Sequence, residues 1–380
     1  MPWSDLEPRS IPHLTNLVRP YRRACWAATG RCADGFADWE NVTDGLFAEL
    51  PRLKWKPLDA GHARAGGYVL ELPPSGPARL AAVSLDMGEP TIGTLIVQAS
   101  GARGGEIIDF FFCEALKPDG APYLEPKSNA CGASMSARLR LRAGRTSYEF
   151  FQMMGHRYLV AVARDTRRPL RLRLALRETI YPHAVRGRFR CDDRTLNDIY
   201  RISVRTQRVC SLDAYVDTPW REQAQWWGDA RVQAQNTFHI SGDVRLFVRG
   251  IRSIARQSTP NGLTYGHAPT VAHHCVLPDF SIIWVLTIWD YYWQTGDLEL
   301  FRQQWPRIQR LLAYFAGEGR GRNGLLRFDP RYWLFLDWAD IHREGTPALL
   351  NLWYLYICLL YTSDAADDLL CVDLGGRRII

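Results

Sequence analysis

The stretch Asp217-Thr-Pro-Trp-Arg-Glu-Gln-Ala-Gln-Trp-Trp-Gly-Asp229 crowds carboxylates and tryptophans into thirteen residues. The faces of tryptophan rings pack against the apolar faces of a pyranose ring. Carboxylates accept hydrogen bonds from sugar hydroxyls, and one of them can protonate a leaving oxygen. Arg221 beside Glu222 can orient that carboxylate or offset its charge. Composition alone favours a sugar site and a helix start with a buried tryptophan face about equally.

The same stretch resembles the motif Pro-x-Arg-Glu-Gln-x-x-Trp-x-Gly-Asp of glycoside hydrolase family 78, the bacterial α-L-rhamnosidases. The resemblance implies that Asp217, Glu222 and Asp229 line a rhamnose pocket and that Glu222 is the general acid. Many members of the family carry Arg-Asp-Glu here, with one residue more before the tryptophan. The order Arg221-Glu222-Gln223 therefore leaves Glu222 as the single candidate acid within the motif. The resemblance covers residues 8 to 355, and its N-terminal part is the loosest.

Two later segments, Pro278-Asp279-Phe-Ser-Ile-Ile-Trp284 and Phe335-Leu-Asp337-Trp338, resemble further pocket elements of this family. The resemblance implies that Asp279 and Asp337 bind sugar hydroxyls, and that Trp284 and Trp338 form walls of the pocket. Two alternatives stay open: Asp279 as the N-cap of a helix beside Ser281, and Asp337 as part of a loop salt bridge.

The tryptophans of the first motif cannot all contact one ligand. Trp226 and Trp227 differ by one helical step, so one of them is expected in the core, and Trp220 is a further candidate for a pocket wall. No metal ligand and no cofactor is expected. The predicted substrate-binding residues are Asp217, Arg221, Trp227, Asp229, Asp279, Trp284, Asp337 and Trp338.

The mechanism implied by the resemblance is inverting hydrolysis of a terminal L-rhamnoside. A second carboxylate then activates water about 6.5–9.5 Å from the acid. In the family this base is a glutamate in the later helices of an (α/α)6 barrel, which we expect to be absent from this chain. Two alternatives remain: another (α/α)6 sugar hydrolase or phosphorylase, and a non-catalytic carbohydrate-binding protein.

Short apolar or alternating runs bounded by Gly and Pro, such as Gly67–Leu72 and Ala81–Met87, predict an antiparallel β-sandwich domain, or domains, over residues 1–183. Helical spacing begins near Asp193. Further helices are predicted at about 226–239, 243–257, 281–295, 298–316 and 347–357. Helices that alternate with long loops favour the N-terminal half of an (α/α)6 barrel over residues 184–357.

The C-terminal end has a different character. Cys358–Asp367 resembles the translation of a tagmentation sequencing adapter, and Cys371–Ile380 resembles a translated flow-cell primer in the same frame. Segment 358–380 is therefore predicted to be a non-native tail. The native start is equally open, because an upstream domain or a signal peptide can precede Met1.

Composition indicates a globular chain, with 47% apolar and 12% aromatic residues. The net charge of +7 comes mostly from arginines that alternate with apolar residues, which is typical of strands with a basic face. Since no nucleic-acid motif accompanies the charge and no run spans a bilayer, the expected partner is a rhamnose-containing glycoside rather than nucleic acid or membrane.

The seven cysteines before residue 358 are irregularly spaced, without zinc-ligand spacing, and favour a reduced, cytoplasmic setting.

Overall fold

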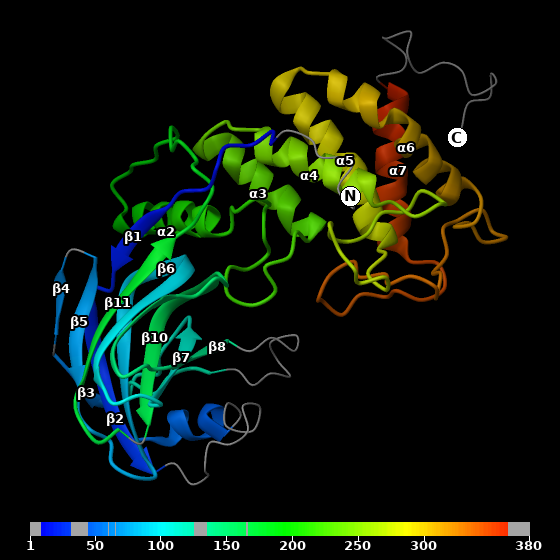
Figure 1. Ribbon diagram of the computed structural model, residues 1–380. Coiled ribbons are helices and arrows are strands. Elements are labelled where there is room, and N and C mark those ends of the chain that lie inside the picture. Colours follow the sequence, from blue (N-terminus) through cyan, green and yellow to red (C-terminus); the bar gives the residue numbers. More distant parts are fainter. Residues whose placement is uncertain are drawn as a thin grey trace, which may run out of the picture. The chain divides into compact units, whose positions relative to one another are not determined.

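The computed structural model describes residues 9–31, 45–59, 61–64, 66–124, 135–164 and 166–363, the last three by their backbone alone (Figure 1). They form two compact units. The β unit comprises residues 12–183 and 188–223, and the helical unit comprises residues up to 11, 184–187 and those from 224 onward. Across these ranges, every helix is too short or too polar to cross a lipid bilayer.

The β unit contains one large antiparallel sheet, whose main path runs β4-β5-β11-β6-β10-β7-β8. Of the remaining strands, β1 pairs with β11, β2 and β9 pair with β6, and β3 pairs with β2. The strands in chain order are β1 (Leu17–Pro20), β2 (Arg23–Arg31), β3 (Lys56–Pro57), β4 (His62–Arg64), β5 (Gly67–Leu72), β6 (Arg79–Ala102), β7 (Ile107–Cys113), β8 (Ser136–Arg140), β9 (Gly144–Glu149), β10 (Met154–Arg164) and β11 (Leu170–Glu178). A short 3-10 helix, Leu50–Arg52, lies between β2 and β3.

The long strand β6 explains how one sheet encloses a core. Its first half pairs with β2 and β10, and its second half pairs with β11 and β9. Side chains from both halves, including Leu85 and Val97, join residues of β5, β7, β10 and β11 in one buried cluster. The sheet therefore folds over on itself, as a sandwich does, while its strands stay in one hydrogen-bonded network (Figure 1).

A second apolar cluster lies on the opposite face of the sheet. It includes Leu80 and Ala82 of β6, Phe111 of β7, and Val160 and Val162 of β10. Alternation along each strand sends successive side chains to opposite faces, so Phe110 and Phe112 belong to the first cluster and Phe111 to the second. Apolar side chains of β7 are thus buried on both faces of the sheet.

Helix α2 (Arg194–Val209) belongs to the β unit. Asp193 caps it by accepting hydrogen bonds from the amides of Thr195 and Leu196. Arg205 fixes the helix to β11 through Glu178, with an Nη2–Oε1 distance of 2.6 Å. The division between units therefore follows α2 and the motif turn, at residue 223, whereas the sequence places the domain border at 183.

The helical unit contains the remaining helices predicted from spacing. They are α3 (Trp227–Ile240), α4 (Arg245–Arg256), α5 (Pro278–Thr295), α6 (Glu299–Ala316) and α7 (Ala348–Ser363). Helix α5 contacts the other four and is buried along most of its length (Figure 1). Helix α7 continues past Ile357 into the segment predicted to be foreign.

Glycine and aspartate residues cap helices at the loops between them. Gly296 ends α5 in a left-handed conformation with φ 70°, which glycine adopts without steric cost. Asp297 then accepts a hydrogen bond from the amide of Glu299 at 2.8 Å. Asp243 likewise accepts from the amide of Arg245 before α4.

Candidate active site

The turn of the motif lies directly on β10 within the β unit. A Cβ atom at Gly155 would stand 2.0 Å from the carbonyl oxygen of Pro219 and 2.8 Å from the amide nitrogen of Trp220. Such contacts are far inside van der Waals distance, so residue 155 has to be glycine for the turn to rest here. This explains the glycine of the Gly-His-Arg-Tyr sequence in β10.

Trp220 anchors the turn rather than lining a pocket. Its indole Nε1 donates a hydrogen bond to the carbonyl oxygen of Phe112 at 2.8 Å, and the ring belongs to the first apolar cluster of the sheet. The alternative that Trp220 walls the pocket is therefore wrong, because its faces pack against the core of the β unit.

Glu222 lies at the partly exposed end of the same turn. Its Oε1 is 3.6 Å from Nη2 of Arg221, and the two side chains are 25% and 35% exposed. The following residue, Gln223, has φ 51° and is held there by hydrogen bonds from its Nε2 to the carbonyls of Met153 and Pro219. A side chain held at positive φ stores backbone strain, and such strain is concentrated at functional sites.

Asp217 begins the motif turn and is partly buried. The thiol of Cys210 approaches its backbone carbonyl at 4.0 Å. Asp217, Arg221 and Glu222 thus belong to one short turn of the β unit, which presents two carboxylates and a guanidinium group within six residues.

The remaining residues of the motif belong to the helical unit. Trp227 is fully buried in α3, where it stacks on Phe247 and donates a hydrogen bond to Thr287 at 3.2 Å. The prediction that Trp227 binds substrate is wrong, because no face of its ring is left for a ligand. The next residue is Gly228. A Cβ atom there would lie 2.8 Å from the ring of Phe280, which explains the glycine at this position.

The prediction that Trp284 forms a wall of the pocket is also wrong. It is 1% exposed within α5, and its Nε1 donates to the carbonyl oxygen of Ile251 in α4 at 3.1 Å. It joins α5 to α4 and cannot wall a pocket. Asp229, by contrast, is exposed in the first turn of α3, where the helix dipole favours a carboxylate.

Asp279 is completely buried, and it has neither of the two roles expected from sequence. Leu277 occupies the N-cap position of α5. The carboxylate of Asp279 instead accepts hydrogen bonds from the amides of Leu336 at 2.7 Å and Phe335 at 3.4 Å. Burial raises the pKa of Asp279 to about 6. Asp279 therefore holds a loop in place, which explains why Leu336 keeps its φ of 55°.

That loop exposes the other two predicted residues. Asp337 is exposed and accepts hydrogen bonds from the amides of Trp338 and Ala339, and Trp338 is 85% exposed. Arg343 closes the loop, because its guanidinium donates to the carbonyls of Phe335, Asp337, Ala339 and Ile341. Trp338 is thus an exposed ring on an ordered loop.

Trp338 is part of an aromatic cluster that the sequence analysis did not predict. Neighbouring rings meet edge to face, with centroids 4.4 Å apart for Trp226 and His267, 5.8 Å for Trp226 and Trp333, and 5.0 Å for Phe335 and Trp338. The aromatic cluster consists of Trp226, His267, Phe280, Trp333, Phe335 and Trp338. The available signal was the aromatic content of the long loops between helices. Trp226, rather than Trp227, is the motif tryptophan that faces this cluster.

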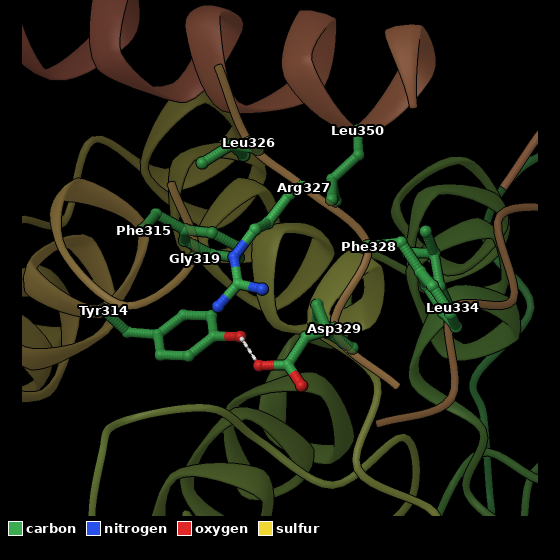
Figure 2. A pocket seen from close by; sticks show the side chains of 10 residues that line it. Tyr314, Phe315, Gly319, Leu326, Arg327, Phe328, Asp329, Leu334 and Leu350 are labelled. Atoms are coloured by element: carbon green, nitrogen blue, oxygen red, sulfur yellow. Dashed lines mark hydrogen bonds between the residues drawn. The ribbon is translucent and has the colours of Figure 1, made fainter. Parts of the chain in front are cut away.

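A small cavity near α5 and α6 is too small to hold a sugar. Its volume is about 10 Å³, which is room for a single water. Figure 2 shows the hydroxyl of Tyr314 directed at Asp329, and this hydrogen bond is 3.3 Å long. Across the residues that the structure describes, no group of three or more His, Cys, Asp or Glu side chains is arranged to hold a metal ion.

A family model matches the part of the chain that contains helices α2 to α7. Residues 185–370 match the family model of the bacterial alpha-L-rhamnosidase 6 hairpin glycosidase domain, a range that overlaps the segment predicted to be foreign. A search of curated proteins gave no match.

Solved structures agree in fold. The GH78 family rhamnosidase of Bacillus sp. GL1 is 27% identical with a TM-score of 0.68, and the match covers 74% of this chain and 28% of that one. The Klebsiella oxytoca rhamnosidase with rhamnose bound is 19% identical with a TM-score of 0.68. The match covers 92% of this chain and 65% of that one. The Streptomyces avermitilis alpha-L-rhamnosidase complexed with L-rhamnose is 22% identical with a TM-score of 0.61. The match covers 80% of this chain and 30% of that one.

The chain thus spans less than two thirds of the length of each of these relatives. Residues 185–370, which contain the whole motif, are therefore similar to the bacterial alpha-L-rhamnosidase 6 hairpin glycosidase domain, and the chain is similar in fold to a solved GH78 family rhamnosidase.

Proposed function

We propose that this chain is the part of an inverting α-L-rhamnosidase that carries the general acid and an aromatic saccharide site. The observation that carries the proposal is the partly exposed carboxylate of Glu222, paired with Arg221 on a strained turn, within the residues that match the rhamnosidase family model. Two relatives are described as holding rhamnose, which supports a rhamnose-containing substrate.

The roles follow from the chemistry of each group. Glu222 donates its proton to the glycosidic oxygen as the bond to the anomeric carbon breaks. Arg221 orients that carboxyl group. Asp217, Asp229 and Asp337 accept hydrogen bonds from sugar hydroxyls, each worth about 1.5–3 kcal/mol as a charge-assisted bond. Trp338 offers an apolar face on which a sugar ring can stack.

We further propose that α2 to α7 are the first half of a six-hairpin (α/α)6 toroid, with the general base on a later helix. Apolar side chains that stay exposed support this, since Leu352, Leu355 and Tyr356 of α7 and Ile199 and Ile202 of α2 are about half exposed or more. Further helices packed on these faces would remove this apolar surface from water.

The test uses the enzyme encoded by the uninterrupted reading frame. It should hydrolyse an aryl α-L-rhamnoside, and proton NMR of the first product should show inverted configuration at the anomeric carbon. Release with retention would contradict the two-carboxylate geometry of inversion. Turnover that requires inorganic phosphate would identify a phosphorylase instead. Rhamnose binding without turnover would leave a carbohydrate-binding protein.

A further inference from the structure

Gln223 directly follows Glu222 and is the last residue of the β unit. Its φ of 51° lies in the left-handed region, which only three non-glycine residues adopt in the part of the chain that the structure describes. A Cβ atom makes this conformation costly, whereas glycine adopts it without steric cost. A glutamine at this point of the turn therefore indicates that its side chain has a task that glycine cannot perform.

The side-chain amide of Gln223 joins two parts of the β unit. Its Nε2 donates one hydrogen bond to the carbonyl oxygen of Pro219 at 2.9 Å and another to the carbonyl oxygen of Met153 at 3.1 Å. An amide nitrogen carries two hydrogens, so these two carbonyls use its full donor capacity. The first bond closes the turn that contains Glu222, and the second fixes this turn to the residue before β10.

The preceding side of Glu222 is restrained by separate contacts. The backbone amide of Arg221 donates a hydrogen bond to the hydroxyl of Thr218 at 3.2 Å. The indole of Trp220 is anchored in the core of the sheet. Gln223 supplies the corresponding restraint on the following side. The side chain of Glu222, which is 25% exposed, thus projects from a backbone that is fixed at both neighbours.

Such a restraint matters for a proton donor. A general acid works only when its carboxyl group lies within hydrogen-bond reach of the leaving oxygen, and a displacement of about 1 Å can lower a rate about 100-fold. The rotamers open to a glutamate depend on its backbone conformation. The contacts of Gln223 therefore bear on where the carboxyl group of Glu222 points.

We propose that Gln223 is a positioning residue for Glu222, whose carboxyl group it aims at the glycosidic oxygen by holding the turn. The proposal rests on the function proposed above, in which Glu222 is the general acid. Gln223 acts through Glu222 and does not bind the sugar. Its loss should therefore slow proton donation and spare substrate binding.

The experiment compares Gln223→Met with the wild type of the full-length enzyme on two substrates. An alkyl α-L-rhamnoside needs protonation of its leaving oxygen, whereas a nitrophenyl α-L-rhamnoside needs little. Methionine keeps the length of the side chain and has no N–H donor. We expect kcat on the alkyl rhamnoside to fall about 10- to 100-fold. On the nitrophenyl rhamnoside kcat should fall less than about 3-fold, since its leaving group needs no acid, and KM should stay unchanged for both.

Gln152→Met is the matched control, because it makes the same change at an exposed glutamine beside Met153 and should keep both rates. Gln223→Gly separates the side chain from the backbone, since glycine adopts the same φ without strain but has no amide to donate. It should show the same loss on the alkyl rhamnoside, with a thermal unfolding transition that shows a folded protein.

Wild-type kcat on the alkyl rhamnoside in either Gln223 variant would overturn the proposal. Equal losses on both substrates, or loss of the folded state in both variants, would make Gln223 a residue of general stability and also reject it. A raised KM with unchanged kcat would instead identify a sugar contact.

Glu222→Gln, measured in parallel, separates this proposal from the function on which it rests. If Glu222→Gln keeps its activity on the alkyl rhamnoside, the role of Glu222 as acid fails and the positioning role fails with it. If Glu222→Gln loses activity while both Gln223 variants retain theirs, only the positioning role is rejected.

Discussion

Gly155 and the carbonyl group of Pro219 are in such close contact that a Cβ atom on residue 155 would lie 2.0 Å from the oxygen. This contact fixes the turn that carries Glu222 to strand β10. We predict that Gly155→Ala lowers the free energy of unfolding by about 1–3 kcal/mol, as overpacking does, and displaces the acid. Thermal unfolding and the kcat of the full-length enzyme would show both effects. Gly45→Ala, where nothing lies within 4 Å, serves as the control.

Glu222→Gln should lower kcat on an unactivated rhamnoside by about 10²–10⁴-fold, because the amide cannot donate the proton that the leaving oxygen needs. The loss should be much smaller on an aryl rhamnoside with an acidic leaving group. The measurement is kcat on both substrates with the full-length enzyme. Glu344→Gln, an exposed acid of the helical unit, should retain activity. An unchanged kcat of Glu222→Gln on the natural substrate would remove Glu222 from the role of acid.

Asp279 predicts a pH dependence of stability. Burial raises the pKa of Asp279 to about 6, from an ordinary value of 3.8. Between these values the unfolded chain loses the proton first, so the free energy of unfolding falls as pH rises from about 4 to 6. The integrated loss is about 3 kcal/mol above pH 6.

Asp279→Asn should abolish most of this decline, since the amide keeps an oxygen for the Leu336 N–H group and cannot ionise. Urea unfolding between pH 4 and pH 7 measures it. Asp337→Asn, on the loop that Asp279 holds but exposed, should leave the decline as in the wild type. Parallel curves for wild type and Asp279→Asn would assign the pH dependence to other groups.

Two tryptophans should behave in opposite ways when truncated. Trp227→Ala creates a cavity in the core of the helical unit and should cost about 3–5 kcal/mol of stability. Trp338→Ala removes an exposed ring and should change stability by less than about 0.5 kcal/mol. It should instead raise KM for a rhamnoside about 2- to 10-fold, from the loss of stacking. A Trp338→Ala variant with unchanged KM would exclude this ring from substrate binding.

The sequence was sufficient to locate most elements, because periodicity and capping are local. The predicted run Gly67–Leu72 is strand β5, and the helical spacing that begins near Asp193 marks the start of α2. The predicted run Ala81–Met87 proved to be only the first part of a longer strand, β6, whose partners change along its length. Local pattern does not reveal partners.

Site residues were harder to assign for the same reason. Trp226 and Trp227 are equivalent in pattern, and only packing against Phe247 or against His267 distinguishes them. Asp279 was identified as important, but its partner, the amide of Leu336, is 57 residues away. Resemblance to a family located the motif, while the choice between core and surface depended on tertiary contacts.

Arg343 gives the loop of residues 335–343 an internal scaffold, since its guanidinium engages four backbone carbonyls and no side chain of that loop. The shape of the loop is then insensitive to which side chains it displays. Position 338 and its exposed neighbours can be exchanged while the backbone trace is retained. The loop is therefore suited to sequence variation, and libraries at residues 338–340 should retain folding as long as Arg343 is kept.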